Sequence, residues 1–264
     1  MTNQKAARPT AEWRRAAGRG DFEVVDLARI IDHTILKAQA TPAEVVKLCE
    51  EAARLGFGAV CVNSAHVPLA ARKLAGSKVA VCAVVGFPLG VMATEAKAYE
   101  AGWVVRNGAT EVDMVIAVGH LKGGDDVYVE DDIRAVVQAA RAAAVDARRS
   151  ALANGGNAPA EAANPVVKVI IECCYLSDEE KVQACRLAAA AGADYVKTST
   201  GFGSSGATPG DVALMRDVVG EALGVKAAGG IRDLDSVLAL VSAGADRLGM
   251  SAGVAVIEEA RTRS

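Results

Sequence analysis

Two lysines end short apolar segments in which a buried strand would normally carry aliphatic side chains. Lys197 closes the segment 194–197, and Lys226 closes the segment 224–226 just before a Gly-Gly turn. A buried ammonium group is costly unless a carboxylate pairs with it or its pKa falls. A lowered pKa yields a neutral amine, which is a nucleophile toward carbonyl compounds. The two lysines therefore indicate a site for carbonyl chemistry.

The two lysines are expected on neighbouring strands, which lie about 4.8 Å apart. Two ammonium groups at that distance repel each other, and one is pushed toward its neutral form. A single lysine could instead extend its amine to solvent, but the pair favours a functional site. Asp113, within the apolar segment 111–116, supplies an opposite charge. From spacing alone, Asp113 is either a structural ion-pair partner or a proton carrier.

The bulk composition limits the kind of protein that can contain this site. The chain has 264 residues, a formal net charge of −3, and 52% hydrophobic but only 4% aromatic residues. This length and an aliphatic core suit one large domain, and single α/β barrels are often of this size. Charges of both signs are scattered, without the basic stripe of a nucleic-acid binder, and no apolar run reaches the roughly 18 residues of a membrane helix. We expect neither a nucleic acid nor a membrane as a partner.

The N-terminus and the cysteines both favour a cytoplasmic location. Residues 1–20 contain basic side chains but no apolar signal-peptide segment, so we expect residues 1–24 to be a flexible or loosely docked extension. The six cysteines form no CxxC pair and lie mostly inside expected strands and helices. This pattern favours buried free thiols over a disulfide framework. They are Cys49, Cys61, Cys82, Cys173, Cys174 and Cys185.

A repeated pattern along the chain predicts the fold. An alanine-rich helical stretch ends at a glycine, the usual helix stop, and a short β-branched segment follows. These segments are continuously apolar, as strands covered on both faces are. The eight expected strands are 30–36, 59–63, 79–85, 111–117, 166–172, 195–198, 225–228 and 247–250. Eight such units predict a single-domain α/β structure, a (β/α)₈ TIM barrel over residues 25–264, with a doubly wound open sheet as the alternative.

Local signals mark helix starts and one interruption. Capping patterns begin at Thr41, Ser177 and Thr208, each with an acidic residue three positions later. The segment 139–165, dominated by Ala, Arg, Asn and Gly, breaks the repeated pattern, and its first part can extend a helix. We expect a loop insertion around 145–165 in the barrel and not a domain boundary.

Glycine-rich turns after the last three expected strands suggest a phosphate site. The segment 201–206 matches GxGxxG, but the next helix starts later, at Thr208, so a dinucleotide site is disfavoured. Further glycine turns follow at 229–230 and 249–253. Exposed backbone N–H groups near helix N-termini suit a phosphate, although glycine is also common in tight turns. The isolated residues His33, His66 and His120 lack metal-binding spacing, so we expect no metal.

Six motifs in order resemble the 2-deoxyribose-5-phosphate aldolases, a family of class I aldolases. They span most of the chain, from about residue 28 to 256, and are the segments 31–34, 84–90, 111–116, 167–172, 196–203 and 225–232. The resemblance implies reversible retro-aldol cleavage of 2-deoxy-D-ribose 5-phosphate to D-glyceraldehyde 3-phosphate and acetaldehyde. It further implies a lysine Schiff base, no cofactor, a small phosphorylated sugar as substrate, and a homodimer or a higher homo-oligomer.

The resemblance also assigns roles to individual residues. Lys197 would form the Schiff base, Lys226 would perturb its pKa and take part in proton transfer, and Asp113 would shuttle protons. The phosphate would be held by Gly201, Gly229, Gly230, Gly249 and Ser251. The sugar end would be lined by Asp32, Thr34, Cys61 and Thr200.

The chain departs from the pattern of this family at a few positions. Phe202 stands where some members carry a phosphate-binding lysine, and the tail 257–264 lacks the tyrosine that some members fold into the site. Ala228 and Met250 stand where other small residues are common. Two alternative functions stay open: another Schiff-base aldolase or transaldolase, and a phosphosugar-binding barrel without catalysis.

Overall fold

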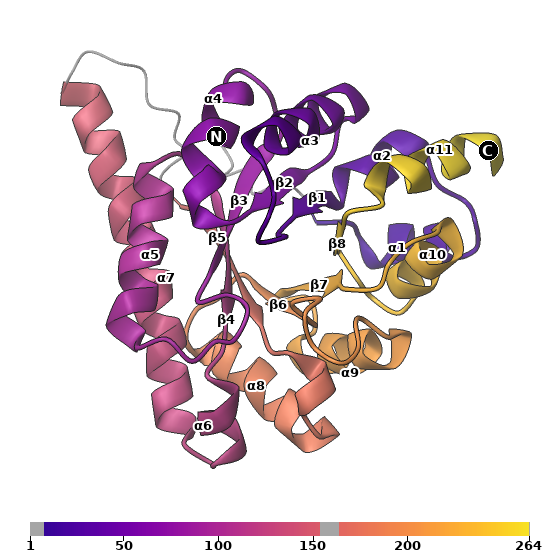
Figure 1. Cartoon of the computed structure of the whole chain (residues 1–264). Coiled ribbons are helices and arrows are strands. Elements are labelled where there is room, and N and C mark those ends of the chain that lie inside the picture. The colour runs from indigo at the N-terminus through magenta and orange to yellow at the C-terminus, as the bar shows by residue number, and fades with distance from the viewer. Residues whose placement is uncertain (1–7, 154–163, 264) are drawn as a thin grey trace.

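The computed structural model describes residues 8–153 and 164–263, and its centre is a closed barrel of eight parallel strands (Figure 1). The strands follow one another around the barrel in chain order, and β8 pairs with β1. This confirms the predicted TIM barrel and rules out the open sheet. The strands are β1 Ile31–Ile35, β2 Ala59–Val62, β3 Ala80–Val85, β4 Glu111–Val115, β5 Val166–Ile170, β6 Tyr195–Lys197, β7 Gly224–Ala228 and β8 Arg247–Met250.

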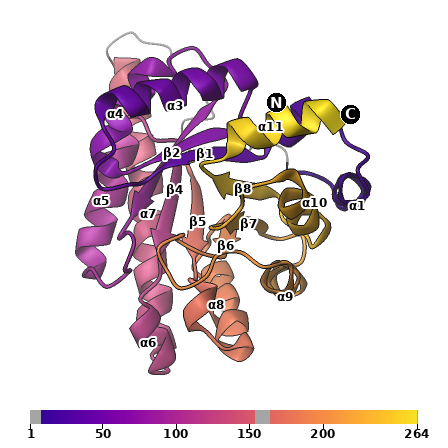
Figure 2. The same ribbon diagram turned by 45° about the vertical axis from the view of Figure 1, so that its right-hand side comes forward.

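Helices surround the barrel and cover the outer face of the strands (Figure 2). Because one face of each strand packs on helices and the other faces the barrel interior, strands such as β2, β4 and β7 are buried along their whole length, whereas β1 is half-buried at its carboxyl end. The helices are α1 Ala11–Gly18, α2 Val24–Arg29, α3 Pro42–Leu55, α4 Val67–Lys73, α5 Thr94–Arg106, α6 Val118–Lys122, α7 Asp126–Ala153, α8 Asp178–Ala190, α9 Pro209–Val219, α10 Leu234–Ser242 and α11 Gly253–Arg263, with short 3₁₀ turns η1 Ser64–His66 and η3 Cys173–Tyr175.

The three capping patterns form as expected. The side chains of Thr41 and Ser177 accept the N–H of the residue three positions later, and the glutamate at that position closes the capping box. Thr208 accepts the N–H of Asp211 in the same way at the start of α9. These caps satisfy N–H groups that a helix start would otherwise leave unpaired, and they fix where each helix begins.

The N-terminal extension is docked more closely than expected. Helix α1 packs against α10, and Arg14 is buried between the carboxylates of Glu221 and Asp246. A Cβ on Gly18 would lie 2.5 Å from the Cβ of Ser242, so the two helices approach at a distance that only glycine permits there. The two carboxylate partners of Arg14 are more than 200 residues away in the chain, and no local pattern predicts them.

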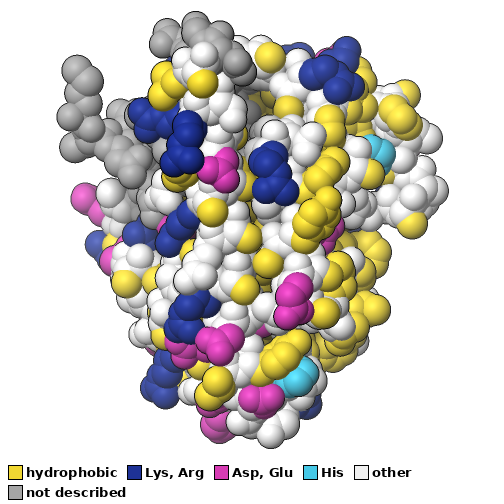
Figure 3. Space-filling model, turned by 90° about the vertical axis from the view of Figure 1, so that its left-hand side faces the viewer, with side chains coloured by type: hydrophobic (Ala, Val, Ile, Leu, Met, Phe, Trp, Pro, Cys, Tyr) yellow, Lys and Arg dark blue, Asp and Glu magenta, His cyan; other side chains and the backbone are white. Residues whose placement is uncertain are grey.

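The predicted insertion at 145–165 lies partly outside the described residues. Residues 145–153 continue α7, which packs along α5, and 154–163 are not described. The six cysteines are free, and five of them are buried, as expected for thiols in an aliphatic core. Figure 3 shows basic and acidic side chains interspersed with apolar ones on the side of α5 and α7. Among the described helices, none combines the length and apolar character of a membrane span.

Candidate functional site

The barrel register places the two lysines side by side, as predicted. Lys197 and Lys226 are direct partners in the β6–β7 pairing. A carboxylate oxygen lies between their amines: Asp113 Oδ2 is 2.8 Å from Lys197 Nζ and 2.7 Å from Lys226 Nζ. The other oxygen, Asp113 Oδ1, accepts from Lys168 Nζ at 2.9 Å. One buried carboxylate therefore contacts three ammonium groups.

Further ion pairs extend this arrangement through the barrel interior. Arg247 Nε lies 2.6 Å from Asp32 Oδ1, and its Nη2 lies 2.7 Å from Glu111 Oε1. Lys168 Nζ is 2.6 Å from Glu111 Oε2, and Asp32 also accepts from Lys226. We call these seven residues the barrel cluster: Asp32, Glu111, Asp113, Lys168, Lys197, Lys226 and Arg247.

The strand alternation explains why these side chains meet. Residues two apart on a strand point to the same face, so Glu111 and Asp113 both enter the barrel from β4. On the neighbouring strand β5, Lys168 is the register partner of Asp113. Lys226 is in turn the register partner of Arg247 on β8. Charged residues on successive strands thus face one enclosed space.

The charges in the cluster set the pKa values of its members. Burial raises the pKa of Asp113, but the ammonium groups of Lys168, Lys197 and Lys226 outweigh burial and hold it well below the usual range. Burial likewise opposes the ionised form of Asp32, and Arg247 and Lys226 outweigh it and lower its pKa. Burial lowers the pKa of Lys226, but Asp113 and Asp32 outweigh that effect and raise it. The expected repulsion between the two lysines is therefore offset by shared carboxylates, and Lys226 is held in its charged form.

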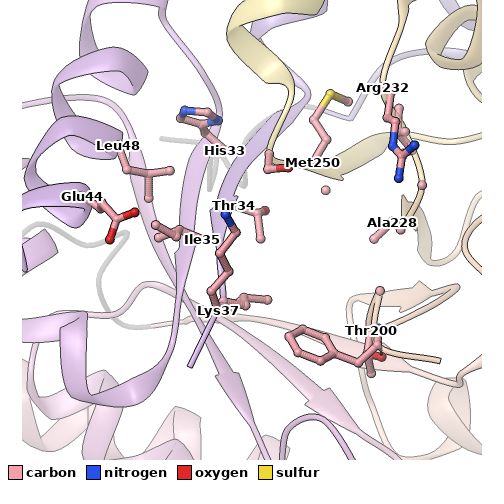
Figure 4. A pocket seen from close by; sticks show the side chains of 18 of the residues that line it. His33, Thr34, Ile35, Lys37, Glu44, Leu48, Thr200, Ala228, Arg232 and Met250 are labelled. Atoms are coloured by element: carbon pink, nitrogen blue, oxygen red, sulfur yellow. Dashed lines mark hydrogen bonds between the residues drawn. The ribbon is translucent and has the colours of Figure 1, made fainter. Parts of the chain in front are cut away.

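A cavity of about 530 Å³ opens above the cluster, at the carboxyl ends of the strands (Figure 4). Lys197 is the one member of the barrel cluster that lines it. Of the other predicted residues, the following line the cavity: Thr34, Thr200, Gly201, Gly229, Gly230, Gly249 and Ser251. Its wall also includes the three departure positions Phe202, Ala228 and Met250. The structure thus brings the predicted Schiff-base lysine and all the predicted phosphate residues to one cavity.

Four predicted residues lie beneath the cavity and not in its wall. Asp32, Asp113 and Lys226 are fully buried in the cluster, and Cys61 is fully buried beside its register partner Cys82. Asp113 is connected to the cavity through its contact with Lys197, and Lys226 is connected to it through Asp113. A direct substrate contact by Asp32 or Cys61 stays a prediction.

The glycine turns give the cavity a backbone wall. Gly229 and Gly230 have φ values of 88° and 79°, in the left-handed region that favours glycine. A Cβ on Gly206 would lie 2.1 Å from the carbonyl oxygen of Gly229, so the β6–α9 and β7–α10 loops touch through bare backbone. Helix α9 begins at Pro209, after the glycine-rich segment 201–206 and not within it, as the sequence predicted. Close by, the first turn of α11 follows Ser251, and a helix N-terminus favours an anion.

Sequence reasoning missed several polar residues at this cavity. Arg232 lines the wall directly after the Gly-Gly turn, and Lys37 lines it from the β1–α3 loop. Figure 4 shows these two side chains entering from different loops around the cavity. The position of Arg232 beside a phosphate-type turn was a usable signal, whereas Lys37 lies in a loop without one. Glu172 does not line the cavity; it ends the expected strand 166–172, and its carboxylate accepts the N–H of Thr200, which does line it.

Carboxylates of the barrel cluster and two neighbouring cysteines are potential metal ligands. Cys61, Cys82 and Asp113 offer donor atoms within 4.8 Å of one another, and so do Asp32, Cys82 and Glu111. In both groups the carboxylates already bind lysine or arginine side chains. These cations take the positions next to the carboxylates that a metal ion would need.

Comparisons with known proteins agree with this geometry. A family model described as DeoC/LacD family aldolase matches residues 27–259. A deoxyribose-phosphate aldolase of Geobacillus sp. (strain WCH70) is 54% identical over 233 residues, covering 88% of this chain and 95% of the relative. The deoxyribose-phosphate aldolase of Carboxydothermus hydrogenoformans is 52% identical over 232 residues, covering 88% and 94%.

The fold is shared with solved structures as well. A deoxyribose phosphate aldolase from Aeropyrum pernix, described as having a unique tetrameric structure, superposes with a TM-score of 0.81 at 30% identity. That match covers 97% of this chain and 100% of the other. The family match begins in α2 and ends in α11, so it includes the whole barrel and its cavity. These findings confirm the resemblance read from the motifs, and the chain belongs to the DeoC/LacD family of aldolases.

Proposed function

We propose that the chain cleaves 2-deoxy-D-ribose 5-phosphate reversibly to D-glyceraldehyde 3-phosphate and acetaldehyde, with Lys197 as the amine that forms the Schiff base. The observation that carries this proposal is the position of Lys197. It is the amine of the barrel cluster that lines the cavity, and it contacts the buried Asp113 at 2.8 Å. The names of the relatives supply the substrate, since they are deoxyribose-phosphate aldolases.

The charge balance of the cluster supports Lys197 as the nucleophile. An amine attacks a carbonyl carbon only in its neutral form. Four cations and three carboxylates make up the cluster, so it holds one more positive than negative charge. Loss of one proton makes the cluster neutral. Lys226 and Lys168 have raised pKa values because carboxylates outweigh their burial, so both are held in their charged form, whereas Lys197 is the amine with access to the cavity.

The reaction then follows from an electron sink at this amine. Lys197 attacks C1 of the open-chain sugar, and loss of water gives a protonated imine. The C2–C3 bond breaks, its electron pair moves toward the imine nitrogen, and the C3 hydroxyl loses its proton, which releases glyceraldehyde 3-phosphate. The resulting enamine takes a proton at C2, and water hydrolyses the imine to acetaldehyde. No oxidant or reductant is needed.

Asp113 and Lys226 support this sequence from below the cavity. Asp113 stays ionised because its pKa is well below the usual range, through the ammonium groups that outweigh its burial. Its negative charge stabilises the protonated imine at Lys197, and its contact with both amines provides a path for a proton between them. A proton taken up by Asp113 is held only transiently, since the carboxylate is a weak base here.

The phosphate is proposed to bind at the glycine turns of the cavity. Backbone N–H groups around Gly229–Gly230 and the start of α11 suit an anion, and Arg232 adds a cation on the same wall.

Replacing Arg232 with Gln should raise KM for deoxyribose 5-phosphate and leave KM for unphosphorylated deoxyribose unchanged. Lys47→Gln is the control, because Lys47 lines the same cavity with its ammonium 3.8 Å from Glu51. Equal effects on both sugars would contradict the phosphate assignment.

Covalent trapping tests the main proposal. Borohydride with acetaldehyde should reduce the imine and add one ethyl group irreversibly to Lys197, as peptide mass analysis can locate. Lys197→Met should abolish both labelling and turnover, whereas Lys47→Met should keep both. A label on another lysine, or turnover in Lys197→Met, would show that the nucleophile is misassigned.

Assembly is proposed to be homo-oligomeric. The relative from Aeropyrum pernix is described as tetrameric, and the β3–α5 loop of this chain exposes Leu89 and Val91 by 71% and 73%. Light scattering after gel filtration measures the number of copies, and a mass of one chain at micromolar concentration would contradict the proposal. A cytoplasmic location stays a prediction from the sequence.

A further inference from the structure

Glu172, just after β5, has an unusual backbone. Its φ and ψ are 57° and 66°, and it is the one non-glycine residue with a positive φ among those the structure describes. L-residues adopt this left-handed conformation only with strain, and glycine adopts it freely. Strain of this kind persists where the surrounding structure enforces it, often at functional sites. The reason for a glutamate here must therefore lie in its side chain.

The side chain of Glu172 is buried, and its short hydrogen bonds all come from Thr200, with the Cys174 thiol as a longer contact 3.9 Å from Oε1. Both carboxylate oxygens lie 3.2 Å from the backbone nitrogen of Thr200, and Oε2 also accepts the hydroxyl hydrogen of Thr200. From the other side, the N–H of Phe202 donates to Thr200 Oγ1 at 3.0 Å. The Thr200 hydroxyl therefore has its hydrogen and one acceptor position committed to the protein.

Thr200 lines the main cavity, and Glu172 does not. Glu172 lines a separate small cavity of about 70 Å³ that shares only Thr200 and Phe202 with the main one. The loops are packed tightly there, because a Cβ on Gly203 would lie 3.3 Å from the carboxyl carbon of Glu172. Glu172 thus acts on the site through Thr200, three residues after Lys197 in the chain.

We propose that Glu172 is a positioning residue that fixes the hydrogen-bond direction of Thr200. A hydroxyl offers one donor and two acceptor positions. With its hydrogen held by Glu172 and one acceptor position used by Phe202, Thr200 presents its remaining acceptor position to the cavity. Thr200 then accepts from a hydroxyl of the substrate and gives specificity for a hydroxylated sugar fragment. This inference rests on the proposed aldolase function and adds how the site recognises the hydroxylated part of its substrate.

The substitution Glu172→Gln tests the direction without changing the shape. The amide oxygen can still accept the N–H of Thr200, but the NH₂ end turns toward the hydroxyl as a donor. The Thr200 hydrogen is then released toward the cavity. We expect kcat/KM for deoxyribose 5-phosphate to fall roughly tenfold, as expected for one lost hydrogen bond. The rate of borohydride trapping with acetaldehyde, which has no hydroxyl, should not change.

A double-mutant cycle shows whether Glu172 acts through Thr200. Thr200→Val removes the hydroxyl with little change in shape and should lower kcat/KM for the sugar phosphate by a similar factor. In the Thr200→Val background, Glu172→Gln should have no further effect. Additive losses, an unchanged kcat/KM in Glu172→Gln, or an equal loss of acetaldehyde trapping would each overturn the proposal.

A second variant covers the case in which Glu172→Gln does not fold. Glycine adopts the backbone angles of residue 172 without strain, so Glu172→Gly should fold while it removes the carboxylate. It should show the same selective loss with the sugar phosphate and the same unchanged trapping by acetaldehyde. Trapping with the wild-type protein distinguishes failure of the aldolase function from failure of the positioning role. If the wild type does not trap acetaldehyde at Lys197, the aldolase function is wrong. If the wild type traps acetaldehyde and the Glu172 variants behave like wild type, the positioning role is wrong.

Discussion

Lys97 and Lys197 are both buried lysines, but they lie in different surroundings. Lys97 on α5 is 0% exposed, and its amine contacts Asp132 Oδ2 at 2.6 Å and the carbonyl oxygen of Val115 at 3.0 Å. The second oxygen of Asp132 accepts from Thr94 at 3.0 Å. One ammonium and one carboxylate balance each other there, and neither lines the main cavity. This pair holds α5 to α7.

The barrel cluster differs in how its charges are shared. Asp113 alone contacts three ammonium groups, and the four cations outnumber the three carboxylates. Lys197 is also next to a cavity of about 530 Å³. The comparison shows that burial of a lysine does not by itself indicate catalysis. We expect catalysis where an uneven charge balance lies beside an accessible cavity.

The largest expected contrast is the response to removing each lysine. Lys197→Met should reduce turnover by at least about a thousandfold, since the nucleophile is gone. Its stability should be kept or increased, because the cluster loses its excess positive charge and no carboxylate is left unpaired. Steady-state rates and urea unfolding measure the two effects. A large loss of stability in Lys197→Met would contradict the charge balance assigned to the cluster.

Removing Lys97 should have the opposite outcome. Lys97→Met leaves the buried carboxylate of Asp132 without its cation, and such losses cost about 3–5 kcal/mol of unfolding free energy. kcat should stay unchanged at temperatures where the variant is folded. The double variant Lys97→Met/Asp132→Asn should recover part of the stability, because no buried charge is left unpaired. If the double variant is as unstable as the single one, the loss comes from packing and not from charge.

Acid unfolding should report mainly on the barrel cluster. Asp32 and Asp113 have pKa values lowered by nearby cations that outweigh burial, so the folded state binds protons less readily than the unfolded state. Their contribution is fully present above the unfolded pKa of about 3.9 and is lost as the pH falls below it. Asp32→Asn should flatten the loss of stability below about pH 4, and Asp131→Asn, at an exposed site, should not. Equal slopes in urea titrations of both variants would contradict this account.

The sequence predicted the barrel well because its signals are local. Strand segments followed glycine stops, and the predicted spans match the observed strands to within a few residues, as at β8 Arg247–Met250. The neighbouring positions of Lys197 and Lys226 followed from consecutive strands in a barrel. Glycine turns after β6, β7 and β8 were visible for the same reason. Each of these features depends on residues close together in the chain.

The rest depends on contacts that no local pattern contains. Arg247 meets Glu111 across 136 positions of the chain, so the sequence predicted that the two lysines and Asp113 belong to one site, but not that Arg247 and Glu111 join them. Lys97 lies in a helix, where a lysine is ordinary, and its burial appears only once α5 packs on α7. The backbone of Glu172 is set by the packing of two loops and not by its residue type.

The smallest expected effect is a difference in slope at alkaline pH. Burial lowers the pKa of Lys97 and outweighs the opposing effect of Asp132, whereas the carboxylates around Lys226 outweigh burial and raise its pKa. Below the unfolded pKa of about 10.4, the unfolded state therefore holds the Lys97 proton more tightly than the folded state, and this group makes stability rise with pH.

Lys226 contributes a constant stability in that range and loses it only as the pH rises further, toward its folded pKa. The destabilisation by Lys97→Met should thus grow as the pH rises toward the unfolded pKa, and that by Lys226→Met should stay level. Urea unfolding at several pH values measures both, and parallel curves for the two variants would show that the surroundings of the two lysines do not differ as the structure indicates.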